Sequence, residues 1–415
     1  MKKMIGACAL SLVVLVAAVS VAAQTEVDQT KSARPDGRVE INNVQGSVHV
    51  VGWDRNEVRV HGKLGRGVER LDFDVSDGRT IVRVVYPRST RRSRPSHLTV
   101  QVPGASRVGV DTVSAGIRAE KVLGAVRLKS VSGDLEVSEA PGAVDLESVS
   151  GDVNASDAVG DVEVRTISGD IELHQASPSA DYSDFGGPKG EPLHRVMSGK
   201  VRMRSVSGDI EITGKLLQEV ECETVSGDIQ IEGAFINDGE AELATTSGSV
   251  KVAADNVEVQ INSISGDIRI AGESLRGAEC ETVSGSIRAE GSFVPDAEVR
   301  VSSNSGRVEV LGGHLASVDA ESKSGSLTVR GTKLAPDARL RLGTHSGSIS
   351  MTLPRDCSGR FDFETHSGRI STDIGPEPTS VSRHGPGKKL SFTVGSSKAR
   401  ISAKAFSGSI TLRTR

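Results

Sequence analysis

A Ser-Gly pair recurs twelve times along this chain and restricts its possible folds more than any other feature. The twelve glycines stand at 133, 151, 169, 208, 227, 248, 266, 285, 306, 325, 347 and 368, so all but one pair of neighbours are 18–22 residues apart. Each pair lies in one template, h-x-h-x-[S/T]-x-S-G-z-h-x-h, where h is mostly a Val, Ile, Leu or another small apolar residue. Alternation with period two on both sides of a fixed glycine predicts two short β-strands joined by a sharp bend.

Because every copy keeps the same template, equivalent strands of successive copies can pair in register, which predicts that the copies stack on one another. We therefore predict an all-β fold, a single-chain β-solenoid similar to a parallel β-helix, of about 14–15 rungs of 18–22 residues that lie ~4.8 Å apart. The position two before the repeated serine is Ser or Thr in all twelve copies. We expect these hydroxyls to form an internal ladder in which each donates to the next, and the glycine to supply a positive φ at the bend.

Three degenerate copies, at Val39–Val50, Val108–Ala119 and Ile401–Leu412, extend the array and predict atypical outer rungs that close it. Only 11 of the 415 residues are aromatic (8 Phe, 2 Tyr and 1 Trp), whereas 46 are Gly. This composition favours stacked β-structure filled by small branched side chains.

The chain divides into four predicted regions. Residues 1–23 are a signal peptide, 24–35 a disordered linker, 36–103 an N-terminal non-repeat β region that contains the first degenerate rung, and 104–415 the solenoid. The 39-residue interval predicts an insertion loop at 175–199, and a Pro- and Gly-rich stretch predicts a second loop at 373–389.

The first segment has the three parts of a secretory signal. Lys2 and Lys3 precede an apolar run, and Val21-Ala22-Ala23 fits cleavage before Gln24. A retained membrane anchor is the alternative. No later segment approaches the ~20 apolar residues that span a bilayer. We expect an exported protein that is periplasmic, surface-bound or secreted.

Three cysteines follow the signal segment, namely Cys222, Cys280 and Cys357. Cys222 and Cys280 occupy one column three rungs apart, which is roughly 14 Å and beyond the reach of a disulfide. We expect small buried hydrophobes that hold no metal.

The formal charge of −4 gives no reason to expect nucleic acid as a partner. A basic loop at 87–97 carries Arg88, Arg91, Arg92 and Arg94, and either docks a polyanion or is a solvated loop tip. The insertion carries Tyr182 and Phe185, and either forms a partner-binding surface or is a tolerated decoration.

The residue after the corner glycine has three interpretations. It can be a turn residue, part of a carboxylate row for Ca²⁺, or part of a polysaccharide-cleaving site. The Ca²⁺ row would comprise Asp134, Asp152, Asp170, Asp209 and Asp228. Later copies replace this Asp with Ser or Arg, which favours the turn role. We predict no catalytic residues and no other cofactor, because no His-Glu-x-x-His, phosphate loop or nucleophile elbow is present.

The stretch VEINNVQGSVHVVGWDRNEVRV (39–60), Val-Pro at 102–103 and the serial VSGD corners carry a family resemblance. The chain resembles a bacterial family of β-strand-repeat proteins that carries the name adhesin and has no established function. The resemblance covers essentially all of 36–415, and implies an exported solenoid at the cell envelope with no catalytic residues. The expected function is a non-enzymatic adhesin or surface scaffold that presents a long β-face to an unknown envelope polymer or protein, with self-association possible. The alternative is a β-helix protein that binds or cleaves polysaccharide.

Overall fold

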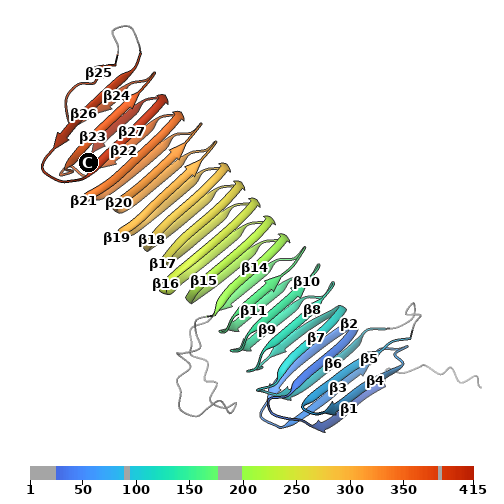
Figure 1. The fold of residues 1–415 in the computed structure, drawn as a ribbon. Helices are drawn as coiled ribbons and strands as arrows, with labels where there is room; N and C mark the ends of the chain where they lie inside the picture. The colour runs from blue at the N-terminus through green and yellow to red at the C-terminus, as the bar shows by residue number, and fades with distance from the viewer. Residues whose placement is uncertain (1–24, 88–93, 176–198, 382–385) are drawn as a thin grey trace, which may run out of the picture.

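The computed structural model describes residues 25–87, 94–175, 199–381 and 386–415. Its strands stack side by side into one elongated rod that runs from the N-terminal to the C-terminal region (Figure 1). Every regular element in the described residues is a β-strand, which confirms the predicted all-β solenoid. The predicted signal peptide at 1–23 lies outside the described residues.

Each rung contributes one strand before its Ser-Gly corner and one strand after it. β7 (Arg107–Glu120) runs through its degenerate corner as one strand. The next rungs form separate strands: β8 (Val126–Ser130), β9 (Leu135–Ala140), β10 (Val144–Ser148), β11 (Val153–Ala158), β12 (Val162–Arg165), β13 (Ile171–Gln175) and β14 (Lys200–Ser207). Later strands run on from one Ser-Gly corner to the next: β15 (Ile210–Ser226), β16 (Ile229–Ser247), β17 (Val250–Ser265), β18 (Ile268–Ser284), β19 (Ile287–Ser303), β20 (Val308–Ser322) and β21 (Leu327–Ser346).

Neighbouring rungs pair in parallel and in register at the Ser-Gly corner. Ser205 pairs with Thr224, Thr224 with Thr245, and Thr245 with Ser263. The differences in rung length are absorbed on the far side of the rung, where the register shifts between Ala234 and Gly239. The Ser-Gly corners therefore form straight columns along the rod.

The core is filled by the alternating apolar residues that the template predicts. Cys222, Leu243, Ile261 and Cys280 are successive members of one buried column, so the two cysteines lie three rungs apart as expected. Both are free thiols, and burial raises their pKa far above the usual value. Cys357 is also free and buried.

The corner glycine has a different role from the one expected. None of the twelve repeated glycines has a positive φ. A Cβ built on any of them would instead lie 1.7–2.3 Å from the carbonyl oxygen of the corner residue in a neighbouring rung. Glycine is required at the corner because the backbones approach too closely for any side chain.

The expected hydroxyl ladder is also corrected. One hydroxyl-to-hydroxyl bond joins Thr112 to Ser130 at 3.1 Å. Several other Oγ atoms bond the backbone: Ser130 accepts the N–H of Gly133 at 2.8 Å, and Ser303 donates to the carbonyl of Gly285 at 3.0 Å. Apart from the Thr112–Ser130 pair, these hydroxyls therefore bond the backbone of their own corner or of the neighbouring corner, and not the hydroxyls of neighbouring rungs. The hydroxyls of Thr166, Ser205, Ser263 and Thr282 are buried and make no hydrogen bond with the described residues.

The N-terminal end is built around β2 (Arg38–Trp53), the first degenerate copy, which pairs with β7 on one side. On its other side lie β5 (Arg79–Val85) and β6 (Ser96–Pro103), also parallel to β2. The antiparallel strands β3 (Glu57–Leu64) and β4 (Arg70–Ser76) pair with β6 and β5. The predicted disordered linker at 24–35 is wrong, because β1 (Thr25–Ser32) pairs antiparallel with β3 along its whole length.

The C-terminal end does not follow chain order. β27 (Arg400–Ser407) lies between β21 and β23 (Gly359–Thr365), and β28 (Ile410–Thr414) lies between β22 (Ile349–Leu353) and β24 (Ile370–Thr372). The last copy was expected to end the stack, and is instead an inner rung. The outer rung is capped by antiparallel β26 (Lys388–Val394), which pairs with β23 and with β25 (Thr379–Ser380).

Candidate functional site: the corner ridge and groove

The Ser-Gly corners expose a row of aliphatic side chains. The residue between the buried hydroxyl residue and the repeated serine points outward, and these side chains are 37–54% exposed. We call this row the corner ridge; its aliphatic members are Val44, Val113, Val131, Val149, Ile167, Val206, Val225, Ile264 and Val283. Thr246 occupies the one interruption between Val225 and Ile264. In-register stacking turns one exposed residue per rung into a continuous apolar line.

A groove runs beside the corner ridge. Its volume is about 1070 Å³, and it extends from the rung of Thr166 to the rung of Thr344. The Ser or Thr side chain of each rung points inward, so the outward side chains immediately before and after it stand on opposite sides of the groove. The ridge forms one side, and charged residues such as Arg204, Glu223 and Glu281 form the other.

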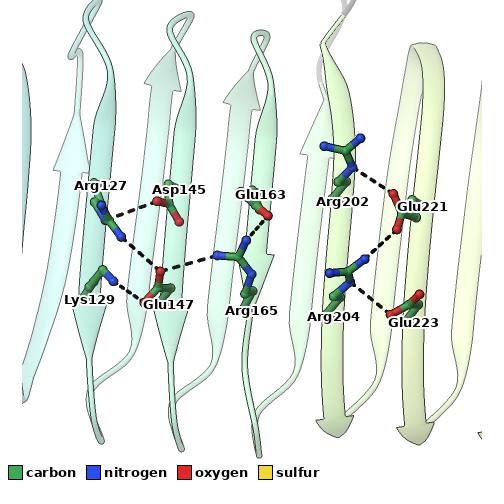
Figure 2. A network of polar contacts seen from close by, with 10 residues as sticks. All are labelled: Arg127, Lys129, Asp145, Glu147, Glu163, Arg165, Arg202, Arg204, Glu221 and Glu223. Atoms are coloured by element: carbon green, nitrogen blue, oxygen red, sulfur yellow. Dashed lines mark hydrogen bonds and ion pairs between the residues drawn. The ribbon is translucent and has the colours of Figure 1, made fainter.

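The charged side belongs to a network that crosses the rungs (Figure 2). Arg202 and Arg204 both bind Glu221, at 2.9 and 2.8 Å, and Arg204 also lies 3.1 Å from Glu223. The hydrogen bond from Arg202 lowers the pKa of the Glu221 carboxyl.

Closer to the N-terminus, the Glu147 carboxylate accepts hydrogen bonds from Lys129 and Arg127. The hydrogen bond from Lys129 lowers the pKa of the Glu147 carboxyl. Opposite charges thus face each other between these rungs, which supports their register.

Aromatic rings replace the aliphatic ridge at the C-terminal end. Phe406 lies between His345 and His366, with 4.7 Å between ring centroids on each side and interplanar angles of 4° and 10°. The three rings come together because β27 lies between β21 and β23. Between the aliphatic and aromatic parts, the column holds Asn304 and Lys323.

The Asp row exists as a column, and its carboxylates serve the backbone. Asp170 Oδ1 accepts the N–H of Asp209 at 2.9 Å, and Asp209 Oδ1 accepts the N–H of Asp228 at 2.8 Å. Asp134 and Asp152 make the same contact one rung along. Within the described residues no group of three or more His, Cys, Asp or Glu side chains is arranged to hold a metal ion. The calcium row stays a prediction.

Most of the other predicted partner residues cannot be placed. Arg88, Arg91, Arg92, Tyr182 and Phe185 lie outside the described residues. Arg94 is described; it is exposed, and its amide binds the carbonyl of Arg66 at 2.8 Å.

The corner ridge was not predicted, although its signal is visible in the template. The unassigned x between the hydroxyl residue and the repeated serine is Val or Ile in seven of the twelve copies. An outward position that stays aliphatic is unusual in a half-buried strand, where the solvent face is normally polar.

The fold and this corner define the class of protein: a parallel β-solenoid whose stacked corners expose an aliphatic row. The model of the Toastrack DUF4097 family matches residues 19–182, 155–312 and 297–413, and the chain belongs to this family. A comparison with curated proteins finds no match.

Solved bacterial structures are similar at low sequence identity. A "putative cell adhesion protein" from Clostridium sporogenes is 9% identical, with 94% of this chain and 100% of that chain covered and a TM-score of 0.17. A "putative adhesin" from Bacteroides fragilis is 10% identical, with coverage of 94% and 97% and a TM-score of 0.19. A third, from Parabacteroides merdae, is 8% identical, with coverage of 79% and 95% and a TM-score of 0.23. Scores this low carry no conclusion about this chain.

No helix of the described residues is long and apolar enough to cross a membrane.

Proposed function

We propose that this chain is an exported, non-enzymatic protein of the bacterial cell envelope, an adhesin or surface scaffold that presents its Ser-Gly corners to a polymer or protein partner. The observation that carries the proposal is the corner ridge, a line of half-exposed Val and Ile side chains on successive rungs. Soluble monomers rarely expose a large contiguous apolar patch, and such a patch usually marks a surface that another molecule covers. The family and the signal-like first segment support the envelope location.

The rod is suited to presentation because it is continuous and in register. Parallel pairing holds each corner at a fixed place relative to the next, so the ridge needs no loop to position it. The partner would contact aliphatic side chains on one side of the groove, and charged and polar side chains such as Arg204, Glu223 and Asn262 on the other.

The alternative is a β-helix protein that binds or cleaves polysaccharide. The groove of about 1070 Å³ favours it, since a long open groove fits a linear polymer. Cleavage would need a pair of acids at a fixed separation. The row carboxylates of Asp170 and Asp209 instead accept backbone N–H groups.

Two assays separate these functions. The purified chain is applied to a glycan array, and reducing-sugar release is measured on every glycan that binds. We expect no release; release of product from any glycan overturns the non-enzymatic proposal.

A pull-down from envelope extract then tests the surface. Val206→Lys with Val225→Lys should abolish capture, and the fold should tolerate lysine because Lys323 already occupies this column. Val381→Asp changes an exposed valine in the antiparallel cap at the C-terminal end, beyond His366 and far along the rod from Val206 and Val225, and should leave capture intact. Equal capture by all three proteins would show that the ridge is not the binding surface.

A further inference from the structure

We infer that the corner ridge is covered by a second copy of this chain, packed antiparallel about a two-fold axis that passes between Val206 and Val225. The inference rests on the proposed function, since it names a partner for the same surface.

The repeat distance of the ridge selects its partner. Ridge side chains follow the rung spacing of ~4.8 Å. Side chains on one face of an extended peptide repeat every ~6.6–6.8 Å, and a helix repeats every ~5.4 Å per turn, so neither stays in step over eight rungs. A second solenoid of the same chain has the same spacing along its whole length.

An antiparallel two-fold at this point pairs aliphatic residues on eight rungs, with Thr246 as the one exception. Val206 faces Val225, and the three pairs outside them are Ile167 with Thr246, Val149 with Ile264, and Val131 with Val283. Every member except Thr246 is aliphatic and about half exposed. The apolar pairing ends beyond these eight rungs, where the column becomes polar at Asn304 and Lys323.

The charged column beside the groove agrees with this register. Its members from the first to the eighth rung are Lys129, Glu147, Arg165, Arg204, Glu223, Ala244, Asn262 and Glu281. The two-fold places Lys129 opposite Glu281 and Arg204 opposite Glu223. Glu147 then faces Asn262 and Arg165 faces Ala244, so no like charges meet within this column.

Neighbouring registers are less favourable. A shift of one rung in one direction places Arg204 opposite its own copy. The opposite shift places Glu223 opposite its own copy and Glu147 opposite Glu281. A parallel two-fold would set the charged column against the repeated serines and pair no charges. Like charges across an interface disfavour the wrong register, which is how charge usually sets specificity.

The contact is large enough for a specific dimer. Eight rungs at ~4.8 Å give a contact roughly 38 Å long. A strip about 13 Å wide, close to four residues along a strand, would bury ~500 Å² on each copy and reach the ~1,000 Å² expected of a specific interface. The interface is isologous, as in most homodimers.

Cysteine cross-linking tests both the dimer and its register. Val131→Cys and Val283→Cys are made as separate proteins, and each is oxidised alone and as an equimolar mixture. Both are made in a Cys8→Ser background, and the other native cysteines do not interfere, because Cys222, Cys280 and Cys357 are buried.

The antiparallel register predicts efficient cross-linking in the mixture. Each variant alone should give little, since its two copies would lie about seven rungs, or ~34 Å, apart. A double variant that also carries Val206→Lys should lose the cross-link. Cross-linking of either variant alone would indicate a parallel dimer and overturn the inference, as would absence of cross-linking in the mixture.

The outcome is distinguishable from failure of the proposed function. If the ridge variant loses envelope capture while no cross-link forms, a different partner covers the ridge and the proposed function stands. If the ridge variant still captures its envelope partner and no cross-link forms, both the proposed function and the dimer fail.

Discussion

At the scale of single residues, the corner glycine is the most constrained position of the repeat. A Cβ on Gly227 would lie 2.1 Å from the carbonyl oxygen of Gly208, which is backbone and cannot move aside cheaply. We predict that Gly227→Ala destabilises the chain by more than ~1 kcal/mol, measured as a fall in the melting temperature. Gly109→Ala is the matched control, since the nearest atom to its Cβ is 4.0 Å away. Similar melting temperatures for both variants would contradict the close-approach explanation.

The corner aspartates permit a test that separates charge from hydrogen bonding. Asp170→Ala removes the acceptor for the Asp209 N–H and should cost ~1 kcal/mol of stability, whereas Asp170→Asn keeps a carbonyl acceptor and should cost little. Thermal melts of the two variants check this difference. Equal losses would show that the hydrogen bond is not what matters.

A variant in which two aspartates of the row are replaced by asparagine tests the calcium prediction. Millimolar Ca²⁺ is expected to raise the melting temperature of the native chain and not that of Asp170→Asn with Asp209→Asn, because Ca²⁺ needs the carboxylate charge. An unchanged melting temperature of the native chain would remove calcium from the account.

The sequence predicts residue roles unevenly. The template correctly places Thr166 in the buried hydroxyl column and Gly169 at the corner. The reason for glycine was wrong, because close stacking between rungs is a three-dimensional contact that a single repeat does not contain. The corner ridge went unnoticed because Val in a β-rich template looks like an ordinary strand residue.

At the scale of strands, the charge pairs between rungs should make stability depend on acid pH. The hydrogen bond from Arg202 lowers the pKa of Glu221 below its usual 4.5, so the folded state holds this proton less tightly than the unfolded state. The resulting stabilisation is present above pH 4.5 and is lost as the pH falls through the lowered pKa.

Glu221→Gln should therefore lose up to ~1 kcal/mol near neutral pH and show a weaker decline in acid, measured by denaturant unfolding at several pH values. Glu242→Gln is the control in the same column of the next rung, because Glu242 makes no ion pair with the described residues. Identical pH profiles for both variants would contradict the role of the Arg202–Glu221 pair.

The order of strands at the ends could not be predicted. Every copy of the template can pair with every other, so the register fits equally well whether β27 follows β23 or lies between β21 and β23. The position of β1 was missed for a similar reason. Its sequence, TEVDQTKS, is polar and mostly exposed, and its pairing with β3 comes from the backbone rather than from an apolar pattern.

At the scale of the whole molecule, repetition converts one modest feature into a surface. A single half-exposed valine needs no explanation, but the same position on successive rungs makes a ridge several tens of ångströms long. The fold could be predicted because each repeat contains the pattern of its strands and corner. The corner ridge could not, because it forms only when the rungs are stacked.

Sedimentation equilibrium over a concentration series tests the central claim most directly. The account predicts that the native chain has twice the mass of one chain, and that Val206→Lys with Val225→Lys has the mass of one chain with an unchanged circular-dichroism spectrum. A native chain that remains monomeric at every concentration, or a ridge variant that still has twice the mass of one chain, would contradict it.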